Sequence, residues 1–177
     1  MKKQLLIIPS ILFVLILSIF FYLLIIERNP SELPSNLLNK KVPNFKAESL
    51  LKNENFVSSK EFGNEIILVN FFATWCKPCR AEHVYIKRFA NEKGIRVIGI
   101  NYKDNSNNAI EWLKNLGNPY SDIPVDKNGR IAIDWGVYGI PETFIVNSKG
   151  IIKYRHVGPI TKKIYKKINL LIREIEQ

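Results

Sequence analysis

Cysteine is scarce in this chain: only Cys76 and Cys79 occur among 177 residues, and two positions separate them. A scaffold held by several disulfides is therefore excluded. Internal repeats and low-complexity runs are absent, which excludes solenoid and fibrous proteins. A zinc site would need about four ligands, whereas Cys76, Cys79 and His83 supply three at helical spacing. We expect no metal and no cofactor.

Acidic residues are absent before Glu27, and Lys2 and Lys3 are the only bases in that segment. Residues 5–26 form an uncharged run of 22 residues, about 33 Å long as a helix and enough to cross a hydrocarbon core. No small-residue cleavage pattern follows, so the run predicts an uncleaved signal-anchor, or transmembrane helix. The basic N-terminus, residues 1–4, is expected in the cytoplasm.

A second hydrophobic run of that length is also absent. The sequence thus predicts a single-pass protein of the cell inner membrane, with its C-terminal domain in the periplasm. Residues 27–177 hold all 16 acids and all but two of the 26 bases. Because these bases are spread thinly, we expect no nucleic-acid partner; Lys162, Lys163, Lys166 and Lys167 are interpreted as a solvated helix face.

The exported part begins with a linker, residues 27–40, which contains Pro30, Pro34 and several Asn and Ser residues. The folded domain is expected over 41–177. Apolar runs predict strands at 65–73, 95–102, 143–146 and 151–156. Helices are predicted at 76–93, 106–116 and 160–177, with Ser106 as an N-cap. This order predicts an α/β fold with a mixed sheet covered by helices on both faces.

The two cysteines fall where the first long strand ends and a helix begins. A helix N-terminus favours a thiolate at Cys76, and the cation of Lys77 adds to that effect. Pro78 suits the first helical turn, and Cys79 is placed to resolve a mixed disulfide. A haem-attachment motif would need His after the second cysteine, but Arg80 stands there. A purely structural disulfide stays an alternative, although so short a loop constrains the unfolded chain little.

The segment Trp75-Cys76-Lys77-Pro78-Cys79 resembles the thioredoxin superfamily. Residues 79–83, 99–104, 154–158 and above all 136–144, Gly-Val-Tyr-Gly-Ile-Pro-Glu-Thr-Phe, resemble the CcmG/DsbE group of membrane-anchored thiol:disulfide interchange proteins. The resemblance implies a thioredoxin-like fold and a periplasmic reductant for cytochrome c-type biogenesis. Such a protein keeps the Cys-x-x-Cys-His thiols of apocytochrome c reduced, directly or through a haem-ligation component. A transmembrane electron donor of the DsbD/CcdA type would in turn reduce it.

Two other functions stay open at this point. One is an anchored thioredoxin-like reductase for another exported client, such as a protein of oxidase copper-site assembly. The other is a non-catalytic scaffold that binds apocytochrome.

The resemblance also assigns roles to single residues. It implies a cis peptide bond before Pro141, beside the dithiol, and acidic residues Glu82 and Glu142 that tune reactivity or shape a substrate groove. His83 is interpreted as a packed or solvent-facing residue rather than a functional one. The expected active-site support and groove residues are Trp75, Lys77, Pro78, Glu82, Pro141, Glu142, Gly136, Tyr138, Gly139, Ile140 and Thr143.

At two places this chain departs from the pattern of the proteins it resembles, which limits what the resemblance implies there. Asn70 stands where thioredoxins have a buried Asp, so Glu82 is the remaining candidate for a proton relay. Lys77-Pro78 replaces the Pro-Thr associated with the group. Because this dipeptide influences the redox potential, the potential of the group is not assigned to this chain.

Overall fold

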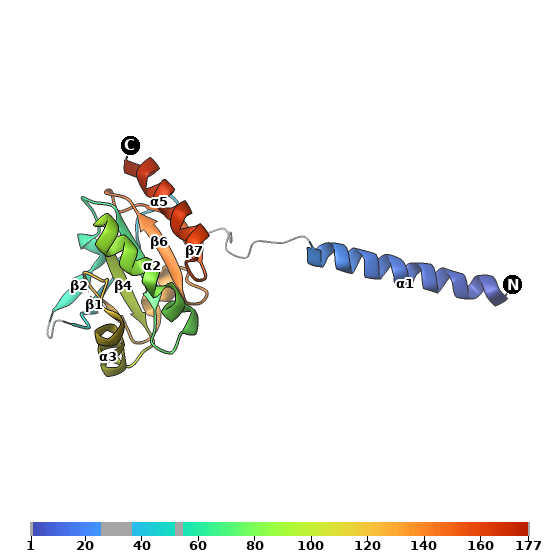
Figure 1. Cartoon of the computed structure of the whole chain (residues 1–177), viewed down its shortest axis with the longest axis horizontal. Coiled ribbons are helices and arrows are strands. Elements are labelled where there is room, and N and C mark those ends of the chain that lie inside the picture. The colour runs from blue at the N-terminus through green and yellow to red at the C-terminus, as the bar shows by residue number, and fades with distance from the viewer. Residues whose placement is uncertain (1, 26–36, 52–54, 177) are drawn as a thin grey trace. The chain divides into compact units, whose positions relative to one another are not determined.

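The computed structural model of the chain describes residues 2–25, 37–51 and 55–176. It forms two compact units, Met1–Pro30 and Ser31–Gln177. The first unit contains helix α1, Lys2–Ile25, with Pro9 inside it (Figure 1). Within the described residues, no helix meets the length and apolarity that crossing a membrane requires.

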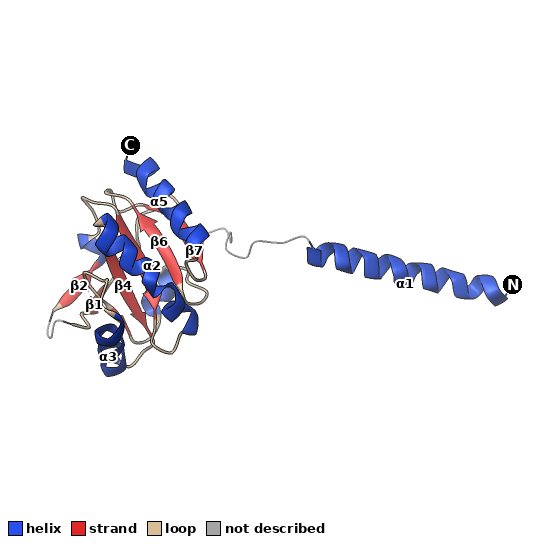
Figure 2. Ribbon diagram, viewed as in Figure 1, coloured by secondary structure: helices blue, strands red, loops and turns tan. Residues whose placement is uncertain are grey.

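The second unit is built on a five-stranded mixed sheet with the strand order β5-β4-β3-β6-β7. The central strand β3 pairs parallel with β4 and antiparallel with β6. Strand β5 pairs parallel with β4, and β7 pairs antiparallel with β6. Figure 2 labels β4, β6 and β7 of this sheet. The bounds are β3 Ile67–Phe72, β4 Arg96–Tyr102, β5 Val125–Asp126, β6 Glu142–Val146 and β7 Ile152–Val157.

Alternation along β3 divides the hydrophobic core into two clusters, one on each face of the sheet. Leu68 and Phe72 belong to the cluster that α2, α3 and α5 cover. Val69 and Phe71 belong to the cluster that α4 covers. The bounds of these helices are α2 Lys77–Lys93, α3 Ser106–Leu116, α4 Arg130–Asp134 and α5 Lys162–Glu176. The prediction of a mixed sheet covered on both faces is confirmed.

Four strands and three helices of this unit lie where the sequence predicts them, with ends within three residues. The short elements β1 (Lys46–Glu48), β2 (Phe56–Ser58), η2 (Ser59–Glu61), β5 and α4 were not predicted, because two to five residues carry too little periodicity. The N-cap prediction for α3 is wrong. Asn105 is the cap, since its Oδ1 accepts from the backbone N–H groups of Asn107 and Asn108.

Most of the predicted linker, residues 27–36, lies outside the described residues. The described end of that segment contacts the domain. The N–H of Asn39 donates to the carbonyl of Ile152 at 2.8 Å, and the N–H of Ile152 donates to the carbonyl of Lys40 at 2.9 Å. Pairing with β7 therefore begins before residue 41.

Candidate active site

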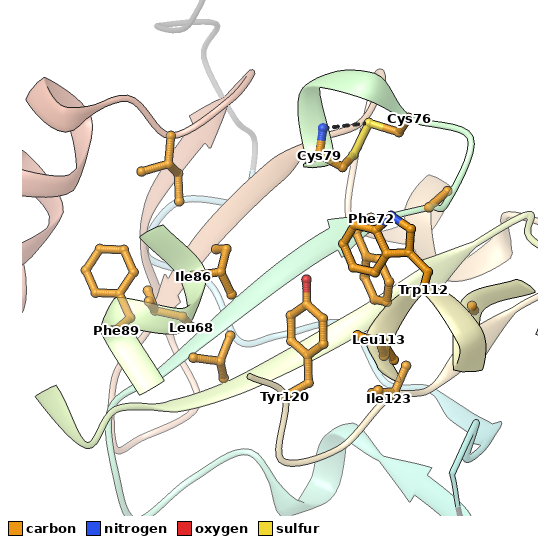
Figure 3. Packing of buried hydrophobic residues seen from close by; sticks show 14 of the residues in the cluster. Leu68, Phe72, Cys76, Cys79, Ile86, Phe89, Trp112, Leu113, Tyr120 and Ile123 are labelled. Carbon is orange, nitrogen blue, oxygen red and sulfur yellow. Dashed lines mark hydrogen bonds between the residues drawn. A yellow bond between two sulfur atoms is a disulfide. The ribbon is translucent and has the colours of Figure 1, made fainter. Parts of the chain in front are cut away.

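Cys76 and Cys79 lie at the N-terminus of α2, just after the carboxyl end of β3. They are disulfide-bonded, with their Cα atoms 5.3 Å apart. Cys76 is the N-cap of α2, and its Sγ accepts a hydrogen bond from the N–H of Cys79 at 3.1 Å (Figure 3). That N–H and the helix dipole would stabilise a thiolate on Cys76. Both cysteines are buried, while Lys77 and Pro78 are exposed.

The peptide bond between Ile140 and Pro141 is cis, as the resemblance implied. Strand β6 starts at Glu142, opposite Phe71 near the end of β3. Pro141 therefore lies beside the point where the chain leaves β3 for the dithiol. Two aromatic side chains on these segments face solvent, Trp75 with 58% and Tyr138 with 73% of its surface exposed. Apolar contact area is thus available next to both segments of the site.

Glu82 is buried one helical turn after Cys79, with 1% of its surface exposed. Its Oε1 accepts from Nδ2 of Asn70 at 2.8 Å, and its Oε2 accepts from the N–H of Ile160 at 2.8 Å. Burial raises the pKa of Glu82 from 4.5 to about 7, against the opposing effect of these two hydrogen bonds. A carboxyl group with a pKa near neutrality can both accept and release a proton at the pH of most compartments.

Asn70 connects Glu82 to two further side chains. Its Nδ2 also donates to Oγ1 of Thr143 at 3.1 Å, and its Oδ1 accepts from the hydroxyl of Tyr120 at 2.9 Å. Burial, followed by the charge of Glu82, raises the pKa of Tyr120 well above its ordinary value. The prediction that Thr143 lines a groove is wrong, because its side chain is buried and lies on the same face of the sheet as Asn70, its partner in the strand pairing. Tyr120 was not predicted, since it lies in a loop that carries no motif.

Glu142 is fully buried and holds the loop that precedes Pro141. Its Oε1 accepts from the N–H groups of Tyr138 at 2.9 Å and Gly139 at 3.5 Å. Arg155 forms a bidentate ion pair with the same carboxylate: its Nε lies 2.7 Å from Oε2 and its Nη2 lies 3.0 Å from Oε1. The guanidinium also donates to the carbonyl of Gly136 at 2.9 Å and lies 4.8 Å from the ring centre of Tyr138. Glu142 thus shapes the loop 136–141, and Arg155 belongs to the site although the sequence assigned it no role.

The chain is similar to known thiol:disulfide interchange proteins. The Redoxin family profile matches residues 37–169. The thiol:disulfide interchange protein DsbE of Tatumella citrea is 45% identical over 172 residues, covering 94% of this chain and 91% of the relative. DsbE of Escherichia coli K12 is 42% identical over 171 residues, covering 93% and 91%. The chain belongs to the DsbE family of thiol:disulfide interchange proteins.

Solved structures agree on the fold. A secreted thiol-disulfide isomerase from Corynebacterium glutamicum superposes with a TM-score of 0.67 at 20% identity, over 77% of this chain and 86% of that one. The thioredoxin domain of a thiol-disulfide oxidoreductase from Bacteroides vulgatus gives 0.65 at 18% identity, over 80% and 99%. This DsbE-family chain therefore has the thioredoxin-like fold. Its Cys76–Cys79 disulfide and its 42–45% identity to thiol:disulfide interchange proteins show that it is a thiol-disulfide oxidoreductase.

The two histidines of this DsbE-family chain are packed residues. Nε2 of His83 lies 2.8 Å from the carbonyl of Gly117, and its ring meets Trp112 edge-on at 4.5 Å. Nε2 of His156 lies 3.3 Å from the carbonyl of Pro159. Burial lowers the pKa of both imidazoles. Neither forms a hydrogen bond with a cysteine or with Glu82.

Proposed function

We propose that this protein is a periplasmic reductant in c-type cytochrome maturation, whose Cys76–Cys79 pair reduces a disulfide in apocytochrome c or in a haem-ligation component. The main support for this proposal is the cysteine pair at the start of α2, with the buried carboxyl group of Glu82 one helical turn further on. The chain is also up to 45% identical to proteins named DsbE. Haem attachment needs free thiols, and exported thiols otherwise become oxidised.

The exchange proceeds in two balanced steps. The Cys76 thiolate attacks one sulfur of the client disulfide, which forms a mixed disulfide and releases one client thiolate. The Cys79 thiolate then attacks Sγ of Cys76 and releases the second client sulfur as a thiolate. The client gains two electrons and the protein becomes the Cys76–Cys79 disulfide. A transmembrane dithiol donor of the DsbD/CcdA type returns two electrons and restores the reduced pair.

Glu82 accepts the proton of Cys79 during the second step. The two residues are three positions apart on α2, so their side chains lie on one face of the helix, and both are buried. A carboxyl whose pKa is about 7 is a base matched to a thiol near neutral pH. Asn70 holds this carboxylate from β3, in the position where thioredoxins carry an acid.

The N-terminal segment serves as the membrane anchor in this proposal. Its uncharged run, residues 5–26, reaches the roughly 20 residues that a span needs, and α1 is helical over Lys2–Ile25. Lys2 and Lys3 favour a cytoplasmic N-terminus. An anchor would keep the dithiol at high effective concentration beside membrane partners.

Covalent trapping tests the proposed client. The full-length Cys79→Ser variant is expressed in cells that make c-type cytochromes. It is expected to retain a mixed disulfide between Cys76 and an apocytochrome or a haem-ligation component. Mass spectrometry after non-reducing electrophoresis identifies the trapped protein. The double variant Cys76→Ala/Cys79→Ser is the control and should trap nothing.

Either of two results would contradict the proposed function. Trapping of a copper-site assembly protein alone would assign another exported client. Normal holocytochrome c formation in Cys76→Ala without added reductant would indicate a non-catalytic scaffold.

A further inference from the structure

The carboxylate of Asp104 contacts the turn that carries the dithiol. Its Oδ2 accepts from the backbone N–H of Thr74 at 2.7 Å, and its Oδ1 accepts from the Thr74 hydroxyl at 2.7 Å. Thr74 lies two residues before Cys76, in the turn between β3 and α2. One acidic side chain from the loop after β4 therefore accepts from both the backbone N–H and the hydroxyl of a residue in the active-site turn.

Asp104 is itself fixed in place from two sides. Nδ2 of Asn101, at the buried end of β4, donates to Oδ2 at 3.0 Å, and the N–H of Asn105 donates to Oδ1 at 2.9 Å. Both oxygens thus accept two hydrogen bonds each from neighbouring donors. A carboxylate satisfied in this way has little freedom to rotate.

The same loop also holds Trp75. The indole Nε1 of Trp75 donates to the carbonyl of Lys103 at 3.2 Å. Lys103 has a φ of +43°, a left-handed conformation that is unfavourable for a non-glycine residue. Its N–H donates to the carbonyl of Asp126 at 3.0 Å. A lysine in this conformation directs its carbonyl toward the active-site turn, and such local strain is typical of functional loops.

We infer that Asp104 is a positioning residue for thiol-disulfide exchange: it locks the turn Thr74–Cys76 so that Sγ of Cys76 stays at the N-terminus of α2. The exchange rate then depends on the position of the Asp104 carboxylate, because Asp104 contacts Thr74 and acts on Cys76 through it. The inference rests on the exchange activity of the dithiol and not on the identity of the client.

Asp104→Asn replaces one carboxylate oxygen by an amide nitrogen and removes the negative charge. In Asp104→Asn, an amide nitrogen at the Oδ2 place would face the donors of Thr74 and Asn101, and at the Oδ1 place it would face the N–H of Asn105. In either orientation the amide nitrogen, a donor, faces another N–H donor. The hydrogen bonds to the turn are therefore weakened, although the side chain keeps its shape. Thr74→Val removes only the hydroxyl contact, and Thr74→Ser restores it. Asp134→Asn, an exposed acid on α4, is the matched control.

The experiment uses the reduced full-length chain in detergent and two small probes. Oxidised glutathione gives the second-order exchange rate constant, and iodoacetamide gives the pH midpoint for alkylation of Cys76. We expect Asp104→Asn to lower the exchange rate constant roughly 10-fold, less than the ~100-fold that a 1 Å misplacement can cost. The alkylation midpoint should rise, since the thiolate loses its alignment with the helix. Thr74→Val should move both in the same direction by less, Thr74→Ser should recover them, and Asp134→Asn should change neither.

The sign of the midpoint shift decides the mechanism. A fall in the midpoint of Asp104→Asn would mean that the aspartate charge acts directly on the thiolate, and it would overturn the inference. A lower melting temperature with unchanged rate constant and midpoint would overturn it too, since it would show support of the fold alone. If Asp104→Asn does not fold, the Val and Ser variants of Thr74 decide by the same criteria. Glutathione exchange is independent of the client trapped in membranes, so the two proposals fail separately.

Discussion

Arg155 and Glu142 form a buried ion pair, with Nε of Arg155 2.7 Å from Oε2 and Nη2 3.0 Å from Oε1 of Glu142. Their side chains are 3% and 0% exposed. The pair joins β7 to the start of β6, directly after the cis-proline. Because the same carboxylate also binds the backbone of Tyr138, the ion pair fixes the loop that borders the dithiol as well as the sheet.

Loss of Arg155 should therefore destabilise the protein strongly. Arg155→Met leaves a buried carboxylate without its cation, which typically costs about 3–5 kcal/mol. Arg155→Lys keeps a charge but loses the two-pronged geometry and should cost less. Urea unfolding of the full-length chain in detergent measures the free energies. Arg173→Met, at an exposed position on α5, is the control; equal losses for Arg155→Met and Arg173→Met would contradict the assignment.

Glu82→Gln should flatten the pH dependence of stability. The pKa of Glu82 is raised from 4.5 to about 7, so between these values the native state binds more protons than the unfolded chain. Stability conferred at low pH is then lost as pH rises through this window, by roughly 3 kcal/mol in total. The substitution fits the site, because Asn70 can turn its amide so that Oδ1 faces the new Gln amide while Nδ2 donates to Tyr120.

Unfolding free energies of the oxidised protein at pH 5 and pH 8 measure this effect. The decrease from pH 5 to pH 8 should be smaller in Glu82→Gln than in the parent chain. Glu92→Gln, exposed on the same helix, should retain the parent decrease. An unchanged decrease in Glu82→Gln would show that the Glu82 carboxyl titrates near its ordinary pKa.

Asn70→Asp, which restores the acid of the general thioredoxin pattern, should destabilise this protein at alkaline pH. The new carboxylate would lie within hydrogen-bond distance of Glu82, where Nδ2 now stands 2.8 Å from Oε1. Two carboxylates this close cannot both ionise without a large cost. The loss in unfolding free energy should be greater at pH 8 than at pH 5. Asn107→Asp, at the start of α3, is the charge-matched control and should be neutral or slightly stabilising; an equal loss at both pH values would point to shape instead of charge.

The sequence was sufficient for the local features of the site. Alternating and continuous apolar residues locate β3 and β6, and Gly94 ends α2 with a left-handed φ of 64°. The position of Cys76 at a helix N-terminus followed from these boundaries. Local patterns decide such features because the relevant residues are neighbours in the chain.

The polar clusters could not be predicted in the same way. Asn70 and Tyr120 are 50 positions apart, and Asn70 and Thr143 are 73 apart. Their contacts depend on which strands pair and on the register, so Thr143 was placed in a groove when it lies in the core. Arg155 lies within the motif 154–158, but its contact with Glu142 crosses from β7 to β6. Tertiary pairing, absent from periodicity, decides these roles.

Acid should destabilise the protein through its buried histidines. Burial lowers the pKa of His83 and of His156 below the ordinary value of 6.5, so the native state binds fewer protons than the unfolded chain just below that pH. The stability that the neutral imidazoles confer is complete above pH 6.5 and is lost as pH falls toward the lowered pKa values. His83→Gln, whose amide can still donate to Gly117, should reduce the loss between pH 7 and pH 5, and His156→Gln should reduce it separately. Urea unfolding across this range in the Glu82→Gln background removes the opposite contribution of Glu82; an acid loss that both single histidine variants leave unchanged would refute the assignment.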